Sequence, residues 1–263
     1  MVKKSGLFSK LYIALVLLLT YLPIIVVVIY SFNESRYGNW TGFTTDWYAE
    51  LFKDRQLGAS LKNSIQLAVS STIIAILVGT AGAVGMAKSH FKAQGLLENV
   101  SMIPIMIPEI IIGIAYLAFF SFAGVPFGMG TLVAAHATFC IPYVYVNVQS
   151  RLVGLDPNYV EAARDLGASP ARAFYDITLP LITPSVLSGG LLAFAMSMDD
   201  VVISFFVTGP TTNTLPVMVF SMLKMGVTPT INALCTIMLA VVIIAIFLFM
   251  LVRKIGSALR NRV

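Results

Sequence analysis

Six long apolar runs constrain the fold of this chain more than any other feature of its sequence. They fall at approximately residues 11–31, 64–86, 97–122, 130–150, 184–207 and 231–252. A helix needs about 20 apolar residues to cross the hydrocarbon core of a bilayer. Because none of the runs alternates between apolar and polar residues, as the strands of a membrane barrel do, each is predicted to be helical. The predicted fold is therefore all-α and polytopic, with six transmembrane helices.

The distribution of charge predicts the orientation of these helices. Only 11% of the 263 residues are charged, against roughly 25% in soluble domains. With six spans both termini lie on one side, which holds twelve of the 17 Lys and Arg residues; the other side has Arg36, Lys53, Arg55, Lys62 and Lys224. The positive-inside rule then places both termini in the cytoplasm. The net charge of +5 follows from this bias, so it does not indicate binding to nucleic acid.

The sequence predicts three successive regions. Residues 1–60 comprise the first span and an outside segment, since residues 31–34 offer no cleavage site for a secretory signal. Residues 61–253 form a core of five helices with a long inside loop at 151–183, and residues 254–263 form a cytoplasmic tail.

The inside loop has the signals of two helices joined by a glycine. Asp156-Pro157 is a favourable helix start, and Gly167 is suited to the left-handed turn that ends a helix. Ser169-Pro170 repeats the start signal, and Leu179-Pro180 is expected to close the second segment. An amphipathic helix lying on the membrane surface is the alternative interpretation.

The spacing within this loop resembles a known motif. Glu161-Ala162-Ala163, then Gly167 and Ile177-Thr178-Leu179-Pro180, are similar to the cytoplasmic coupling motif of type I ATP-binding-cassette (ABC) importer permeases. The resemblance implies that Glu161 docks on an ATP-binding subunit, that Ala162 and Ala163 allow close approach, and that Gly167 makes the turn. The chain has no G-x-x-x-x-G-K-[ST] phosphate loop. It is therefore expected not to be an enzyme and to bind no cofactor, with ATP and Mg on partner ATPase subunits.

Three acidic residues fall inside predicted spans. Glu109 is in the third, and Asp199 and Asp200 are in the fifth. Each acid opposes insertion by roughly 2.5–3.5 kcal/mol, and the spans that carry them contain no Lys or Arg. We interpret them as a pathway for a cation; the alternative is that they are protonated or bonded to Ser197 and to other hydroxyl groups. Because neighbouring residues point about 100° apart on a helix, at most one of the two aspartates is expected to face a given groove.

Three further stretches resemble the second permease subunit of spermidine/putrescine importers. They are Leu166-Gly167-Ala168-Ser169, Ser197 to Val202 and Phe206 to Pro210. The resemblance implies transport of polyamines by alternating access across a bacterial inner membrane. It implies as partners a sister permease in a heterodimer, two ATP-binding subunits and an extracytoplasmic polyamine-binding protein. The substrate pathway would contain Asp199, Asp200, Glu109, Ser197 and Trp47, the last also explained as part of an aromatic belt at the membrane surface.

Other functions remain open from the residues alone. A type I ABC permease with this sequence could carry another cationic solute. Alternatively, the acids could act as proton relays in a proton-coupled secondary carrier. Carriers often contain inverted repeats, and none is found here. A metal site is not expected, because His90 and His136 are isolated from other ligand residues. His136 is interpreted as a hydrogen-bonding residue between packed helices.

Overall fold

The computed structural model describes residues 7–36, 38–88 and 92–260, and His90 lies outside them. Within these residues the regular elements are helices, apart from an isolated bridge between Asn33 and Phe43. The all-α prediction is confirmed. The helices are α1 Leu7–Tyr30, α2 Asp46–Lys53, α3 Arg55–Lys88, α4 Gln94–Met106, α5 Glu109–Phe122, α6 Met129–Val153, α7 Asn158–Asp165, α8 Pro170–Ala173, a π-helical segment η1 Phe174–Thr178, α9 Leu179–Asp199, α10 Val202–Val207, α11 Leu215–Lys224 and α12 Pro229–Arg260.

Five stretches of the described chain are long and apolar enough to cross a membrane. They are Phe8–Tyr30, Arg55–Ala87, Met129–Val153, Pro170–Asp199 and Pro229–Leu248. The third predicted span is a bent pair, because α4 and α5 meet at 104°. The count of six holds when this pair is taken as one span.

Proline explains the bend between α4 and α5. The ring of Pro108 disfavours helical geometry at the residue before it, and Ile107 is extended with ψ 134°. Pro104, by contrast, lies inside α4. Pro108 therefore interrupts the third span, and Glu109 becomes the first residue of α5.

The fifth predicted span does not continue to residue 207. α9 ends at Asp199, Asp200 is extended with ψ 124°, and α10 begins at Val202. The prediction of one helix over 184–207 is wrong because apolar residues on both sides of the break hide it. The Asp200 carboxylate accepts hydrogen bonds from the first backbone N–H groups of α10, at Ile203 and Ser204.

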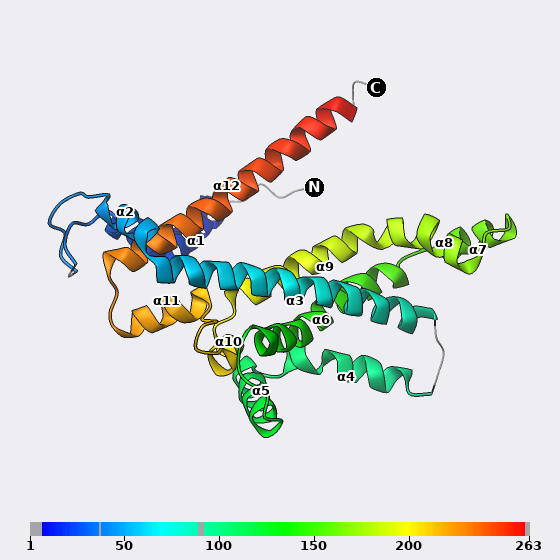
Figure 1. Ribbon diagram of the computed structural model, residues 1–263. Helices are drawn as coiled ribbons and strands as arrows, with labels where there is room; N and C mark the ends of the chain where they lie inside the picture. The colour runs from blue at the N-terminus through cyan, green and yellow to red at the C-terminus, as the bar shows by residue number, and fades with distance from the viewer. Residues whose placement is uncertain (1–6, 37, 89–91, 261–263) are drawn as a thin grey trace. The chain divides into compact units, whose positions relative to one another are not determined.

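The chain forms two compact units, and each is described by itself. One comprises Met1–Gly58 with Ser221–Val263, and the other comprises Ala59–Phe220. In the first unit α12 packs against α1 and α2 (Figure 1). The division into residues 1–60, 61–253 and 254–263 stays a prediction from the sequence.

The core of the Ala59–Phe220 unit lies where α6 packs against α9. Its fully buried residues include Phe139, Val144, Ile182 and Ala193. The helices α5 and α10 also pack together, and they approach closely at Gly113, where a Cβ would lie 2.6 Å from Phe206 Cδ2. Since Gly113 is one turn after Glu109, this contact holds the Glu109 end of α5 beside α10.

The inside loop forms the predicted helix, glycine turn and helix. Asp156 Oδ1 accepts a hydrogen bond from Asn158 N–H at 3.0 Å, α7 follows, and Gly167 has a φ of +87°. Ser169 then caps α8, since its Oγ accepts the Arg172 N–H at 3.3 Å. In Figure 1, α9 leads from α7 and α8 at one end to α10 at the other.

The expected end of the second segment at Leu179-Pro180 is wrong. The helical stretch continues from Pro170 to Asp199. The π-helical turn η1 comes directly before this pair, and Leu179 N–H bonds to Phe174 O, five residues back. Pro180 falls in the first turn of α9. Proline has no backbone N–H to donate, but at this position it follows a π-helical segment whose hydrogen-bond pattern is already altered. The helix therefore continues through Pro180.

Candidate functional site

One pocket in the Ala59–Phe220 unit is lined by the three acidic residues that the sequence analysis singled out. It has a volume of about 490 Å³ and is lined by Glu109, Ala195, Met196, Asp199, Asp200, Val201 and Val202. Each acid lies at a helix break: Glu109 begins α5, Asp199 ends α9, and Asp200 lies in the turn before α10. The breaks therefore bring carboxylates that are 90 residues apart in the sequence to one wall.

The two neighbouring aspartates have different surroundings. Asp199 is exposed, whereas Asp200 is 7% exposed. The difference arises at the end of α9, because Asp199 is the last residue of the helix and Asp200 is extended with ψ 124°. Asp199 and the half-buried Glu109 are the carboxylates open to the pocket, and Asp200 is turned into the protein.

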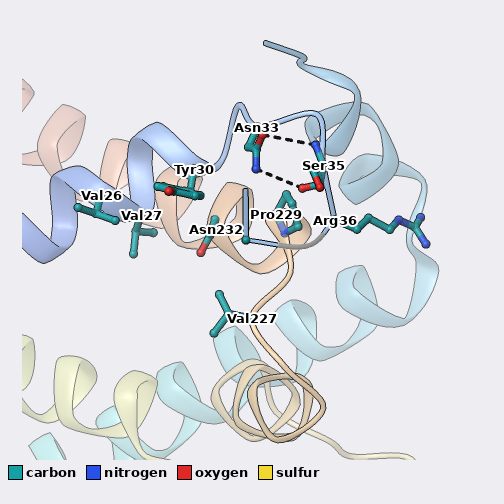
Figure 2. Close-up of a pocket in the computed structure, with 10 residues that line it drawn as sticks. Val26, Val27, Tyr30, Asn33, Ser35, Arg36, Val227, Pro229 and Asn232 are labelled. Carbon is teal, nitrogen blue, oxygen red and sulfur yellow. Dashed lines mark hydrogen bonds between the residues drawn. The ribbon is translucent and has the colours of Figure 1, made fainter. Parts of the chain in front are cut away.

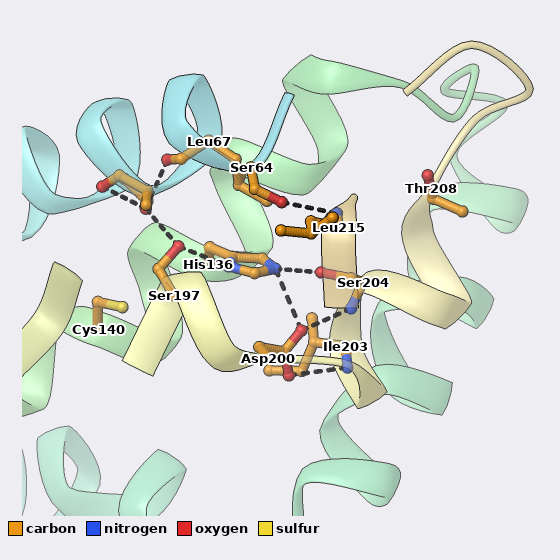
Figure 3. A network of polar contacts seen from close by, with 12 residues as sticks. Ser64, Leu67, His136, Cys140, Ser197, Asp200, Ile203, Ser204, Thr208 and Leu215 are labelled. Carbon is orange, nitrogen blue, oxygen red and sulfur yellow. Dashed lines mark hydrogen bonds and ion pairs between the residues drawn. The ribbon is translucent and has the colours of Figure 1, made fainter. Parts of the chain in front are cut away.

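Asp200 is held by a histidine and by the backbone of α10 (Figure 3). Its Oδ2 lies 3.3 Å from His136 Nε2 and accepts the Ser204 N–H at 2.8 Å, while Oδ1 accepts the Ile203 N–H at 3.1 Å. Both side chains of the Asp200–His136 pair are almost fully buried, at 2% and 0%. A buried carboxylate is stabilised by such charge-assisted hydrogen bonds.

Ser197 belongs to the same buried network. Its Oγ is 2.8 Å from His136 Nδ1 and 3.0 Å from Ser71 Oγ on α3. The hydroxyl of Ser71 in turn donates to Leu67 O at 2.8 Å. Ser197 is not among the described residues that line the pocket. The imidazole ring of His136 links it to Asp200.

Sequence reasoning missed the partnership of His136 with Asp200. It considered Lys and Arg as counter-charges, and hydroxyl groups as neutral partners, but treated His136 as a separate packing residue. The available signal was a histidine inside an apolar span, because polar groups in such positions are expected to find a partner within the bundle.

Trp47 lies in the other unit, on α2. Its indole N–H donates to Asn33 O at 2.7 Å, and the guanidinium carbon of Arg36 lies 5.4 Å from the ring centroid. The ring thus already has a cation of its own chain over its face. Asn33 organises the outside segment, since its Nδ2 donates to Ser35 O at 3.3 Å and to Asn39 O at 2.9 Å.

A second pocket, of about 340 Å³, lies beside this segment within the first unit (Figure 2). Val26, Val27 and Tyr30 of α1 line it, together with Val227 and residues at the start of α12. Its walls carry Arg36 but no carboxylate among the described residues, so it does not suit a cation.

The inside loop presents charged and apolar groups outward. Glu161, Arg164, Asp165 and Gly167 line an open depression of about 510 Å³. The side chain of Leu166 is 91% exposed, and Ala162 is also exposed.

No group of three or more His, Cys, Asp or Glu residues that could hold a metal ion occurs in the described part of the chain.

Residues 71–263 match the family described as binding-protein-dependent transport system inner membrane component. The chain belongs to this family. It is therefore a multi-pass inner-membrane permease of an ABC transporter, and catalysis is not its role.

Curated relatives of this permease are similar over most of their length. It is 41% identical over 235 residues, covering 89% of each chain, to the spermidine/putrescine transport system permease protein PotC of Escherichia coli K12. It is 40% identical to the protein of the same name in Haemophilus influenzae, over 89% of this chain and 91% of the relative. It is 42% identical to the putrescine transport system permease protein PotI of E. coli K12, over 84% and 82% of the two chains.

Solved structures share the permease's fold at low sequence identity. A chain from a bacterial ABC transporter involved in the import of the acidic polysaccharide alginate superposes with a TM-score of 0.73 at 14% identity, covering 95% of both chains. A chain of the MetNI methionine ABC transporter has a TM-score of 0.61 at 14% identity, over 78% of the permease and 95% of that chain. The predicted importer permease fold is confirmed.

Proposed function

We propose that this permease carries spermidine and putrescine across the inner membrane as part of an ATP-driven importer. The observation that carries the proposal is the pocket that brings Glu109, Asp199 and Asp200 together. The names and 40–42% identity of its relatives support a polyamine as the cation. The fold likeness to an alginate transporter says nothing about substrate, because that ligand is a polyanion.

The pocket has the chemistry that an extended polycation requires. Asp199 and Glu109 come from different helices and are open to the cavity, so two amines of one molecule can each meet a carboxylate. The apolar walls at Ala195, Met196, Val201 and Val202 suit the methylene segments between amines. Charge-assisted hydrogen bonds inside a membrane protein are little screened by salt, which favours recognition by charge.

The remaining pathway residues have different proposed roles. Ser197 acts from behind the pocket through His136, because it is buried and bonded to that ring. Trp47 offers an aromatic face on the outside segment, where a substrate amine would replace Arg36.

The inside loop is the proposed coupling element. Glu161, Ala162, Ala163 and Gly167 form the docking turn, and Leu179-Pro180 follow the π-helical segment that joins it to α9. Because α9 ends at Asp199, one continuous helical stretch connects the docking surface with the pocket. The proposed assembly contains a sister permease, two ATP-binding subunits that hold ATP and Mg, and an extracytoplasmic polyamine-binding protein. Both termini are proposed to be cytoplasmic.

Uptake by the assembled complex tests the function. Proteoliposomes containing the permease with its sister permease, ATP-binding subunits and binding protein should accumulate labelled spermidine when ATP is enclosed. Asp199→Asn should raise the KM for spermidine by about tenfold, since it removes a charged partner. Ser188→Ala, which loses only a bond to Pro184 O of its own helix, is the control.

Two outcomes would contradict the proposal. Uptake that excess spermidine and putrescine do not inhibit would assign the permease to another cationic solute. Uptake that continues without ATP but stops when the proton gradient is removed would identify a secondary carrier.

A further inference from the structure

His136 bridges the break between α9 and α10. One ring nitrogen is 2.8 Å from Ser197 Oγ on α9, and the other is 3.0 Å from Ser204 Oγ on α10 and 3.3 Å from Asp200 Oδ2 in the turn between them. The ring itself is on α6 and is fully buried. A single side chain thus contacts both helices and the turn that joins them (Figure 3).

Asp200 transmits this contact to the backbone. Its two carboxylate oxygens accept the N–H groups of Ile203 and Ser204, which have no partner within the first turn of α10. The carboxylate thus fixes the first turn of α10 to the segment that follows α9. Because His136 lies beside Oδ2, the ring helps to set the geometry of the turn.

The turn between α9 and α10 also sets the direction of the Asp199 side chain. Asp199 is the last residue of α9 and is exposed on the pocket wall, directly before the buried Asp200. A rotation of the turn by one residue would exchange the two side chains, since neighbouring residues on a helix point about 100° apart.

We propose that His136 is a positioning residue for substrate recognition. It keeps Asp200 inside the protein, so that Asp199 faces the pocket together with Glu109. The two neighbouring aspartates therefore have different roles. Asp199 contacts the substrate amine, and Asp200 together with His136 holds Asp199 in place. This inference rests on the proposed function.

Two amide variants of His136 distinguish the contact of Nε2 with Asp200 from the contact of Nδ1 with Ser197. In His136→Gln the side-chain amide reaches the position of Nε2, so a donor beside Asp200 is retained. In His136→Asn the shorter amide reaches only the position of Nδ1, beside Ser197. Both variants remove the ring, and they differ in which contact survives.

The test measures KM and Vmax for spermidine uptake by the complete complex in proteoliposomes. His136→Asn should raise KM by about tenfold, the effect of losing a hydrogen bond to a charged group, and leave Vmax unchanged. His136→Gln should restore KM to near the wild-type value. A purely structural role predicts equal effects for the two variants, or a loss of Vmax at constant KM, and either result would overturn the proposal.

A double variant keeps the test available where His136→Asn fails to fold. His136→Asn with Asp200→Asn removes the buried charge together with its partner, which is less costly than removing one member alone. If His136 acts through Asp200, the double variant has the KM of Asp200→Asn alone; additive increases in KM would refute the inference. Failure of the proposed function is recognised separately, because then the wild-type complex shows no uptake of spermidine and Asp199→Asn changes nothing.

Discussion

Asp199 and Asp200 show how neighbouring residues of one type acquire different roles. Asp199 faces the pocket, and Asp200 accepts two backbone N–H groups and lies against His136. Side-chain chemistry is the same at both positions. The difference comes from the turn between α9 and α10, which directs one carboxylate outward and the other into the bundle.

This difference predicts that replacing Asp200 by Ala affects stability, whereas replacing Asp199 by Ala affects uptake. Asp200→Ala should lower the free energy of unfolding by about 1–3 kcal/mol, because the buried N–H groups of Ile203 and Ser204 lose the carboxylate that accepts their hydrogen bonds. Asp199→Ala should leave stability almost unchanged while it impairs uptake. Thermal unfolding of the purified permease complex measures the contrast, and equal stability of the two variants would argue against the buried role of Asp200.

At the scale of elements, the breaks between helices place the functional groups. Pro108 ends the α4 geometry before Glu109, and Asp200 ends α9 beside Asp199. Gly113 then lets α5 approach α10 at Phe206, which brings the two breaks together. On the inside loop, Gly167 provides the turn between α7 and α8 with a φ of +87°.

Gly167 gives a prediction about coupling. Nothing lies within 4 Å of a Cβ built there, so the cost of Gly167→Ala is that of the left-handed backbone, about 1–2 kcal/mol. The variant should therefore lower the number of spermidine molecules transported per ATP hydrolysed, and Gly167→Asn should lower it less, since Asn tolerates this conformation. Gly154→Ala is the control, because φ at Gly154 is −87°. Equal ratios in all three variants would show that the turn does not limit coupling.

At the scale of the whole molecule, positive charge predicts the orientation in the membrane. Twelve of 17 Lys and Arg residues lie on the side of the termini and the inside loop, so Asn158 of α7 should be cytoplasmic and Asn39 of the outside segment extracytoplasmic. Both residues are exposed.

Cysteine labelling checks this orientation. Single cysteines at Asn39 or Asn158, in a permease whose Cys140 and Cys235 are replaced by Ser, are treated with a membrane-impermeant thiol reagent in intact spheroplasts. We expect Asn39→Cys to be labelled, and Asn158→Cys to be labelled only after the membrane is opened. The reverse pattern would invert the assignment of the coupling loop.

Features that depend on near neighbours in the chain could be predicted from the amino-acid sequence. Apolar runs predicted the spans, Asp156-Pro157 and Ser169-Pro170 predicted helix starts, and Gly167 predicted the turn. Each of these effects acts within a few residues, so local pattern suffices. Leu179-Pro180 is the exception, because the helical stretch passes through a π-helical segment and does not end at the proline.

Packing between distant segments, by contrast, determines which aspartate faces the pocket and which histidine contacts the other. His136 is 61 residues from Ser197 and 68 from Ser204 in the chain, and no local pattern records such a contact. The break at Asp200 was hidden because apolar residues flank it on both sides. The association of α12 with α1 also depends on packing between distant segments. Because all the spans are apolar, their composition does not show which of them pack together.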